Sequence, residues 1–428
     1  MKRRTFVQLL AAEAALPFAS RAAQGAPGAY RVGVGGNPDP YTATQRAIAA
    51  NGEFPAVSGR TVIIKPNLVV AWSSATGATT DPQVTRAVVD LALAGGAAQV
   101  LIIEGGAGSK PANFGASDAN GNTYTSVFTG YNPKVQLVDL GSLGASLVTI
   151  NQGYAYKRLY VTNAVTQPNI TFISIGKLKT HVNAFASLSM KNLIALAVPA
   201  AYALPNLLPR MDLHFRGIDQ AVVDVNLASP ISYSVVDGIW GMEGNGPALG
   251  TPVQMNLVLA GKNPVAVDRA GVYAMQLPQG SVAHLAYAAQ RGLGPADLSS
   301  VQFVGDTLTP AAFTPAGSPP LVWRPTPVPA SFAPGSGQTT RIYYMTPAAC
   351  AVQVTIVKDP DTEPAFSYVR LVQGYTNFAG GVGSVVWDGK DGNGNVLPAG
   401  TYLAQVSARA TPSSTNASFA TNWITITG

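Results

Sequence analysis

Apolar runs of about four residues alternate with amphipathic stretches from Arg60 onward, a pattern typical of strands and helices that follow one another along a chain. Thr61–Ile64 and Val100–Ile103 are two such runs, both rich in β-branched residues. Between them, Asp81 and Pro82 supply an N-cap and a proline at the first helical position, and apolar residues then recur at helical spacing. Strand, helix and strand in this order predict two parallel strands joined by a right-handed crossover.

The same alternation continues toward the middle of the chain. Further buried strands are expected at Val135–Val138, Ile170–Ile175, Ser234–Val236 and Leu257–Ala260, and further helices at Ile218–Leu227, Pro264–Gln276 and Ser281–Arg291. Continuous apolar strands between amphipathic helices predict an α/β fold, in which a mostly parallel sheet is flanked by helices.

The composition changes at residues 309–337, where Pro, Ala, Ser and Gly dominate, and this segment is expected to be a linker. Beyond it, residues 338–428 contain short alternating runs separated by turn residues, which predict a small all-β, Ig-like sandwich. The α/β domain is accordingly expected over residues 27–308, after an export signal at residues 1–26.

The first 26 residues have the features of an export signal. Lys2, Arg3 and Arg4 precede a short apolar stretch and a group of small residues, and the paired arginines resemble the twin-arginine type. The apolar stretch is shorter than the ~20 residues that span a bilayer, and cleavage fits after Ala22 or Gly25. We expect a periplasmic or extracellular protein with no transmembrane segment in the mature chain. The alternatives are an ordinary secretory signal and a cytoplasmic protein or retained anchor.

Charge is scarce, since Asp, Glu, Lys and Arg make up 11% of the 428 residues while hydrophobic residues make up 47%. These values exclude intrinsic disorder and coiled coils. The net charge of +6 suggests nucleic-acid binding, but half of this excess lies in residues 1–26 and no basic run follows, so no nucleic-acid partner is expected. The single cysteine, Cys350, excludes an intramolecular disulfide and an iron–sulfur cluster, and it is expected to be a small buried residue.

Several of the few polar and charged residues follow predicted strands. They are Lys65 and Asn67; Glu104, Gly105 and Gly106; Lys177, Lys179 and His181, with Lys191 and Asn192 further on; and Asp237, Glu243 and Asn245. Because ligands bind outside the carboxyl ends of the strands in a parallel sheet, we expect these residues to form one polar cleft.

The residue types in this cleft indicate a small anionic ligand. Lys177, Lys179 and Lys191 can contact a carboxylate or a phosphate, and His181 can act as acid or base. Glu243 is the candidate base or metal ligand. The candidate catalytic residues are Lys179, His181 and Glu243. The cofactor is left open, with a divalent metal as one option.

Each of these segments also has a structural interpretation. The residues after the second strand can form a tight glycine turn, and Lys177 to His181 can be a solvated loop. Asp237, Glu243 and Asn245 either bind a hard cation or stabilise a Gly/Asn turn. The two remaining histidines, His214 and His284, are expected to be packed or on the surface.

Six segments in order resemble the bacterial and archaeal domain-of-unknown-function family 362, over about residues 30–306. They are Ile63–Asn67, Thr79–Pro82, Lys177–His181, Lys191–Asn192, Gly241–Pro247 and Ala260–Asp268. The resemblance implies the fold and the cleft but no reaction. Many members carry ferredoxin-type iron–sulfur modules, which one cysteine cannot supply, and Leu193–Leu196 departs from the family pattern.

The C-terminal residues resemble a second family, the Ig-like domain of the flagellar hook-cap protein. The matching segments are Val386–Gly394 and Pro398–Tyr402. The resemblance implies a spacer or an attachment to the cell envelope or to another protein.

These observations lead to two hypotheses about function. The first is an exported enzyme or cofactor-binding protein that acts on a small anionic ligand in the cleft. The second is a non-enzymatic extracytoplasmic protein that binds a ligand or is attached to a surface, with the Ig-like module as spacer or anchor.

Overall fold

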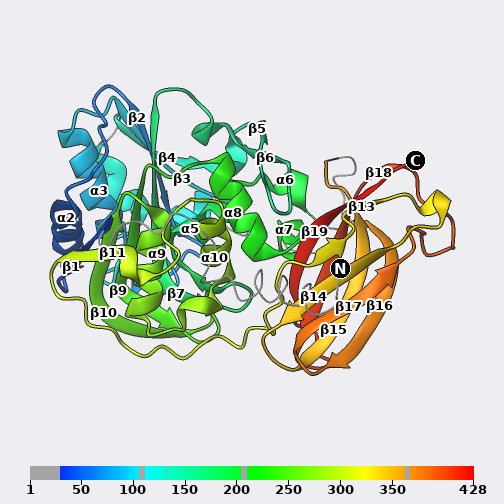
Figure 1. Cartoon of the computed structure of the whole chain (residues 1–428). Coiled ribbons are helices and arrows are strands. Elements are labelled where there is room, and N and C mark those ends of the chain that lie inside the picture. Colours follow the sequence, from blue (N-terminus) through cyan, green and yellow to red (C-terminus); the bar gives the residue numbers. More distant parts are fainter. Residues whose placement is uncertain (1–28, 106–110, 132, 204–209, 362–366) are drawn as a thin grey trace.

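The computed structural model describes residues 29–105, 111–131, 133–203, 210–361 and 367–428 (Figure 1). The predicted export signal and Gly106 lie outside these residues. Among the described helices, none combines the length and the apolar composition that a membrane crossing needs.

In the described part of the chain, the largest sheet has nine strands in the order β11-β1-β10-β9-β7-β2-β3-β4, with β8 paired to β7. Their bounds are β1 Tyr30–Gly36, β2 Thr61–Pro66, β3 Gln99–Glu104, β4 Val135–Asp139, β7 Ile170–His181, β8 Phe185–Ser187, β9 Tyr233–Glu243, β10 Thr251–Gly261 and β11 Val301–Gly305. The run from β9 through β7, β2 and β3 to β4 is parallel throughout, whereas β10 is antiparallel to both of its neighbours. The predicted α/β class with a mostly parallel sheet is confirmed.

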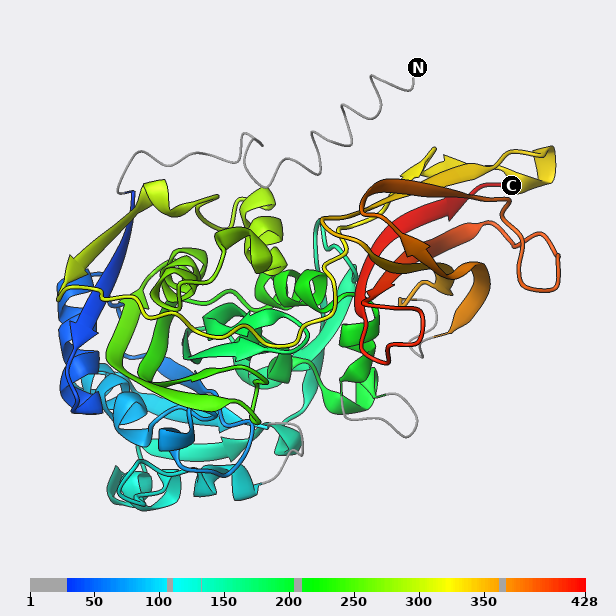
Figure 2. The same cartoon turned by 90° about the horizontal axis from the view of Figure 1, so that it is seen from below.

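Helices cover both faces of this sheet (Figure 2). They are α2 Pro40–Asn51, α3 Pro82–Ala94, α4 Tyr124–Phe128, α5 Leu188–Lys191, α6 Pro199–Tyr202, α7 Met211–Phe215, α8 Ile218–Ala228, α9 Pro264–Ala274 and α10 Ala283–Gln290. Successive strand residues point to opposite faces, so Val62 and Ile64 join the core under α2 and α3, while Ile63 joins the core under α8 and α9. This double burial explains why the strands are continuously apolar.

The predicted unit of strand, helix and strand is β2-α3-β3. Asp81 is the N-cap of α3 and accepts a hydrogen bond from the backbone N–H of Gln83 at 2.8 Å, with Pro82 at the first helical position. The hairpin of β5 (Ala145–Thr149) and β6 (Arg158–Thr162) and the elements β1 and α2 were not expected from the pattern.

Two strands extend well beyond their predicted ends. β7 continues through Lys177 and Lys179 to His181, and β9 continues through Asp237 to Glu243. The interpretation of Lys177 to His181 as a solvated loop is therefore wrong. The strand continues because buried acceptors bind both lysines, so their burial does not leave an unpaired charge.

The C-terminal part consists of two packed sheets, antiparallel except where β13 pairs with β19 in parallel, drawn in yellow to red in Figure 1. Their strands are β12 Thr326–Val328, β13 Ser331–Phe332, β14 Thr340–Thr346, β15 Cys350–Lys358, β16 Tyr368–Phe378, β17 Gly381–Trp387, β18 Gly400–Arg409 and β19 Ser418–Ile426. We call β12 to β19 the C-terminal β module. Trp387 lies at its centre with 1% of its surface exposed, and Cys350 is buried as predicted. The segment expected to be a linker contributes β12 and β13.

Candidate functional site

A small cavity lies at the carboxyl ends of β2, β3 and β7, with a volume of about 160 Å³. Its lining includes seven of the predicted residues, Lys65, Asn67, Glu104, Lys179, His181, Lys191 and Asn192, together with Val69, Ser187, Ile194, Ala195, Arg210, His214 and Pro247. We call it the carboxyl-edge cavity. Residues far apart in the sequence meet here because parallel strands end at the same edge of a sheet.

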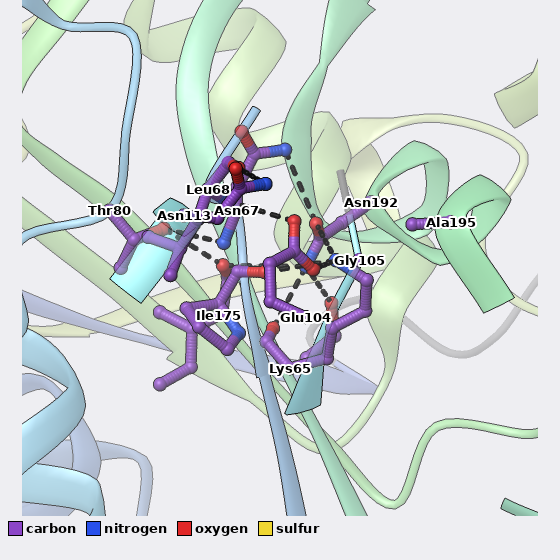
Figure 3. A network of polar contacts seen from close by, with 12 residues as sticks. Lys65, Asn67, Leu68, Thr80, Glu104, Gly105, Asn113, Ile175, Asn192 and Ala195 are labelled. Atoms are coloured by element: carbon purple, nitrogen blue, oxygen red, sulfur yellow. Dashed lines mark hydrogen bonds and ion pairs between the residues drawn. The ribbon is translucent and has the colours of Figure 1, made fainter. Parts of the chain in front are cut away.

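A buried ion pair forms one wall of the cavity (Figure 3). Lys65 Nζ donates to a carboxylate oxygen of Glu104, to Asn192 Oδ1 at 3.1 Å and to the carbonyl of Pro66 at 3.0 Å. The other oxygen of Glu104 accepts from the backbone N–H of Leu68 at 3.1 Å. Burial lowers the pKa of Lys65, and the Glu104 carboxylate opposes that shift. The two charges compensate each other, so this pair shapes the wall and adds no net charge.

Two asparagine side chains connect this pair to the second lysine of the wall. Asn192 Oδ1 accepts from Asn67 Nδ2 at 3.2 Å, and Asn192 Nδ2 donates to the carbonyl of Lys65 at 2.9 Å (Figure 3). Asn67 Oδ1 in turn accepts from Lys179 Nζ at 3.0 Å. The amide groups thereby fix the distance between the carboxyl ends of β2 and β7.

Lys179 is fully buried and surrounded by oxygen atoms. Besides Asn67 Oδ1, its ammonium donates to the carbonyls of Ala78 at 2.6 Å and Pro247 at 2.9 Å. Burial lowers the pKa of Lys179 well below its ordinary value, and the nearby Lys191 lowers it further. An ammonium has three donors, and all three are used here. Lys179 therefore has no donor left for a ligand.

Lys191 differs from the other lysines of the lining. It is the last residue of α5, and within the described ranges its ammonium has no hydrogen-bond acceptor or ion-pair partner. Burial lowers the pKa of Lys191 to about 8, opposed by the more distant Asp219. The side chain is consequently charged in most molecules at neutral pH and carries unused donors.

Two histidines complete the polar lining. His181 Nδ1 accepts from the backbone N–H of Asn183 at 3.0 Å, which leaves Nε2 to carry the proton of the neutral ring. Burial lowers the pKa of His181 well below its ordinary value, and Lys191 adds to this effect. The same two causes lower the pKa of His214 to about 3. Both rings are therefore neutral at pH 7, and His181 presents an N–H donor.

Arg210 lies at the start of α7 with φ of 68°, in the left-handed region that residues with a Cβ atom seldom adopt. Its guanidinium donates to the carbonyls of Gly105 at 3.2 Å, Ala195 at 2.8 Å and Ala197 at 2.6 Å. Burial lowers the pKa of Arg210 only to about 10, so it stays charged. Arg210 joins the loop after β3, which contains the predicted Gly105, to the segment after α5.

Sequence reasoning missed Arg210 and interpreted His214 as packed or on the surface. A signal for both was available: ionisable residues occur at every second position from Arg210 to Arg216, in a chain with 11% charged residues. The segment lies outside any predicted strand or helix. A search for polar residues that follow predicted strands therefore did not include it.

The electrostatic balance of the carboxyl-edge cavity favours an anion. Lys191 and Arg210 are charged and have no carboxylate partner in the lining, Lys65 and Glu104 compensate each other, and both histidines are neutral. Burial of these groups reduces screening by solvent, so the excess positive charge acts strongly on a group inside the cavity.

The predicted residues Lys177 and Asp237 lie elsewhere, because they form their own buried ion pair at 2.8 Å. They are paired across β7 and β9, and Asp237 also accepts from the backbone N–H of Asp81 at 2.8 Å. Burial, together with the neighbouring Asp237, raises the pKa of Asp81 to about 6. The expectation that Lys177 contacts the ligand does not fit this geometry, since its ammonium is bound on the side of the sheet that α3 covers.

Glu243 and Asn245 also lie outside the lining. A carboxylate oxygen of Glu243 accepts from the backbone N–H of Thr314 at 2.6 Å, and Asn245 Oδ1 accepts from that of Gly317 at 3.5 Å. Both side chains hold the segment that leads toward the C-terminal β module. The geometry therefore does not bring Glu243 to His181 as a base.

In the described part of the chain, no group of three or more His, Cys, Asp or Glu side chains is arranged to hold a metal ion. The two histidines of the cavity are accompanied by one carboxylate, which Lys65 already binds. A divalent metal stays a prediction from the sequence.

Fold and cavity together define the class of protein: an α/β protein whose mainly parallel sheet carries a small cationic cavity at its carboxyl ends. Residues 62–273 match the family described as Domain of unknown function (DUF362). The thylakoid-associated protein sll1697 of Synechocystis sp. (strain ATCC 27184 / PCC 6803 / Kazusa) is 25% identical over 240 residues, which are 55% of this chain and 70% of that relative.

Two solved structures were also matched. FlgD from P. aeruginosa is 23% identical with a TM-score of 0.17, over 21% of this chain and 64% of that chain. A β-glucosidase involved in saponin metabolism from intestinal bacteria is 13% identical with a TM-score of 0.18, over 90% of this chain and 53% of that chain. At these scores neither structure bears on the fold or the function.

Proposed function

We propose that this protein binds a small oxyanion, a carboxylate, sulfate or phosphate group, in the carboxyl-edge cavity. The observation that carries the proposal is Lys191, a charged ammonium that faces a cavity with excess positive charge and has no acceptor among the described residues. Lys191 is partly exposed at the cavity, so an anion that enters can accept a charge-assisted hydrogen bond from its free donors. His181 adds a neutral N–H donor on the same cavity wall.

The size of the cavity limits the ligand. A cavity of about 150 Å³ accommodates a benzene molecule, which has six heavy atoms, and the carboxyl-edge cavity measures about 160 Å³. The cavity is open toward solvent, so this volume limits only the group of a ligand that enters it. The ligand, or the part of it that enters, is an anion of about the size of sulfate or a short carboxylic acid.

Isothermal titration calorimetry of the mature protein with sulfate, phosphate and acetate tests the proposal. We expect at least one of these anions to bind with one site per chain, and Lys191→Met to weaken this binding. The matched control is Lys134→Met, which removes the same charge from an exposed position at the start of β4. Equal binding by both variants and the wild type, or no heat with any of the three anions, would contradict the proposal.

A second function is favoured by the pKa of Lys191. A value of about 8 is close to the operating pH of a general acid or base, and buried lysines are tuned to this range in enzymes. In this alternative, Lys191 transfers a proton to or from the bound anion and His181 donates a hydrogen bond. Sequence reasoning had assigned acid and base chemistry to His181 instead.

Lys191→Arg separates the two functions, because arginine keeps the charge but does not titrate near pH 8. We would incubate the protein with small 2-hydroxy and 2-amino carboxylates in D₂O and follow exchange at the 2-position by NMR. Exchange that the wild type catalyses and Lys191→Arg does not catalyse would favour the enzyme. Anion binding without exchange in either protein would favour a binding protein.

We also propose the wider organisation that the sequence suggests. In this proposal the family resemblance extends over about residues 30–306, beyond the matched residues 62–273. The protein is exported by a twin-arginine signal to the periplasm or the exterior, and the C-terminal β module is Ig-like. The paired Arg3 and Arg4 and the Trp387 to Tyr402 segment support these statements.

A further inference from the structure

The short helix α7 takes part in two interfaces. Arg210, at its start, and His214, in its last turn, line the carboxyl-edge cavity. Phe215, the next residue, packs edge-on against Phe419 of β19, with 5.1 Å between the ring centroids. One turn of helix therefore separates the cavity from the C-terminal β module, and Figure 1 shows α7 beside β19.

The C-terminal end of α7 is bound to the C-terminal β module by three hydrogen bonds. Thr421 Oγ1 donates to the carbonyl of Arg216 at 2.8 Å, and Gln405 Nε2 donates to the carbonyl of Phe215. Arg216 Nη1 donates to the carbonyl of Lys358 at 3.1 Å. The first two of these contacts use carbonyl groups that a helix leaves unpaired at its C-terminus.

A reciprocal pair of hydrogen bonds fixes the helix that follows. Gln220 of α8 donates from Nε2 to the carbonyl of Thr421 at 2.8 Å and accepts at Oε1 from the N–H of Thr421 at 2.7 Å. Both residues are at most 1% exposed. Gly217, between α7 and α8, has φ of 104°, and a Cβ atom there would lie 3.0 Å from the carbonyl oxygen of Phe419. The backbones approach so closely that only glycine fits.

Arg210 ties the start of α7 to Gly105, and Tyr156 donates to Asp212 Oδ2 at 2.8 Å. By itself, however, α7 is too short to keep this position. It has five residues, far fewer than the ~12–15 that make an isolated helix even marginally stable. Its N-cap, Arg210, makes no side-chain capping bond and lies in the left-handed region. Packing against neighbours therefore decides where α7 lies, and the C-terminal β module is one of these neighbours.

We propose that the C-terminal β module is a structural part of the anion site, with Gln220 and Thr421 as positioning residues that place His214 and Arg210 at the cavity through α7. This proposal rests on the proposed anion binding for its functional consequence, but the position of α7 can be measured without any ligand. In this proposal the C-terminal β module shapes the anion site, whereas a spacer or an anchor would have no effect on that site.

The test uses the full mature chain and the variants Gln220→Leu, Thr421→Val and Thr421→Ser. Gln220→Leu removes both reciprocal bonds, Thr421→Val removes the bond to Arg216 with the same side-chain shape, and Thr421→Ser retains the hydroxyl. The matched control is Gln373→Leu, which removes a hydrogen bond to the carbonyl of Val352 within the module. All measurements are made at a temperature at which circular dichroism shows every variant folded.

The first readout is the imidazole NMR signal of His214, which can be assigned by substitution because the chain has three histidines. In the wild type the ring stays neutral from pH 7 to pH 4, since burial and Lys191 lower its pKa to about 3. In Gln220→Leu and Thr421→Val we expect the ring to titrate within this range, as α7 moves and exposes it to water. Thr421→Ser and Gln373→Leu are expected to behave as the wild type.

The second readout is sulfate affinity, expected to fall roughly fivefold or more in Gln220→Leu and Thr421→Val and to stay unchanged in the other two proteins. A His214 signal that is the same in all proteins would overturn the proposal, whatever the sulfate result. A moved signal with unchanged sulfate affinity would overturn it as well. A wild type that binds none of sulfate, phosphate and acetate would contradict the proposed function, while a moved His214 signal would still support the role of the module in placing α7.

Discussion

Lys191→Met is the substitution that bears most directly on the anion site. The variant keeps the length of the side chain and removes its charge. A hydrogen bond to a charged group contributes about 1.5–3 kcal/mol, which corresponds to a roughly 10- to 150-fold loss of affinity. The ammonium of Lys191 has no acceptor among the described residues, so it gives up no internal hydrogen bond when it binds the anion. We therefore expect the variant to lose the full contribution of this bond.

The same residue predicts the pH dependence of binding. In the free protein burial lowers the pKa of Lys191 to about 8, and a bound anion favours the charged form, so it raises this pKa. Binding is therefore strongest below about pH 7 and weakens as the pH rises through 8, by up to tenfold for each pH unit. Arg210, with a pKa of about 10, and the histidines, with pKa values far below neutrality, do not titrate in this window.

Calorimetry between pH 6.5 and 9.5 at constant ionic strength measures this effect. Sulfate is the suitable probe because its own charge does not change over this range, whereas phosphate titrates near pH 7. We expect a decline in the wild type, a weak and pH-independent affinity in Lys191→Met, and a pH-independent affinity close to that of the wild type at pH 6.5 in Lys191→Arg. A decline that persists in Lys191→Met would refute the assignment to this residue.

Three further predictions concern stability and export. Glu104→Gln leaves Lys65 buried without a counter-charge and should lower the free energy of unfolding in urea by about 3–5 kcal/mol. Trp387→Ala removes the largest buried side chain of the C-terminal β module and should cost about 3–5 kcal/mol, seen as an earlier loss of its near-ultraviolet circular dichroism. Replacement of Arg3 and Arg4 by lysine should leave the precursor in the cytoplasm, as cell fractionation would show.

Each of these has an outcome that contradicts it. A Glu104→Gln variant as stable as the wild type would mean that Lys65 is neutral in the folded protein, and adding Lys65→Met should then have no effect. If Trp387→Ala leaves the near-ultraviolet circular dichroism of the C-terminal β module and its unfolding midpoint unchanged, the core of the module is not centred on this residue. Export of the doubly substituted precursor at the wild-type rate would favour the ordinary secretory signal.

Elements whose formation depends on a few consecutive residues could be predicted from the sequence. The unit β2-α3-β3 was predicted because its capping aspartate, first-turn proline and β-branched runs act over a few residues. The edge of the sheet where the polar residues gather was also predicted, because the carboxyl ends of parallel strands share one edge. Arg210 was missed, and His214 was not assigned to the cavity, because α7 is held by packing and its sequence has no periodic pattern that would indicate a helix.

The partners of Lys177 and Lys179 could not be predicted from the sequence. They have the same chemistry and lie two residues apart on β7, yet Lys177 binds Asp237 and Lys179 binds three uncharged oxygens beside the cavity. The difference arises from the pairing of β7 with β9, whose register shifts between these two residues. No pattern within β7 contains that information.

The sequence by itself therefore determined the alternation of strands and helices around β2-α3-β3, the edge at which its few charges collect, and the exclusion of an intramolecular disulfide or an iron–sulfur cluster. The tertiary structure alone decided which of these charges compensate one another and which, like Lys191, are left to face the cavity. The physical reason is that periodicity and capping depend on neighbours along the chain, whereas the partner of a buried charge depends on strand register and on segments that lie far away in the sequence.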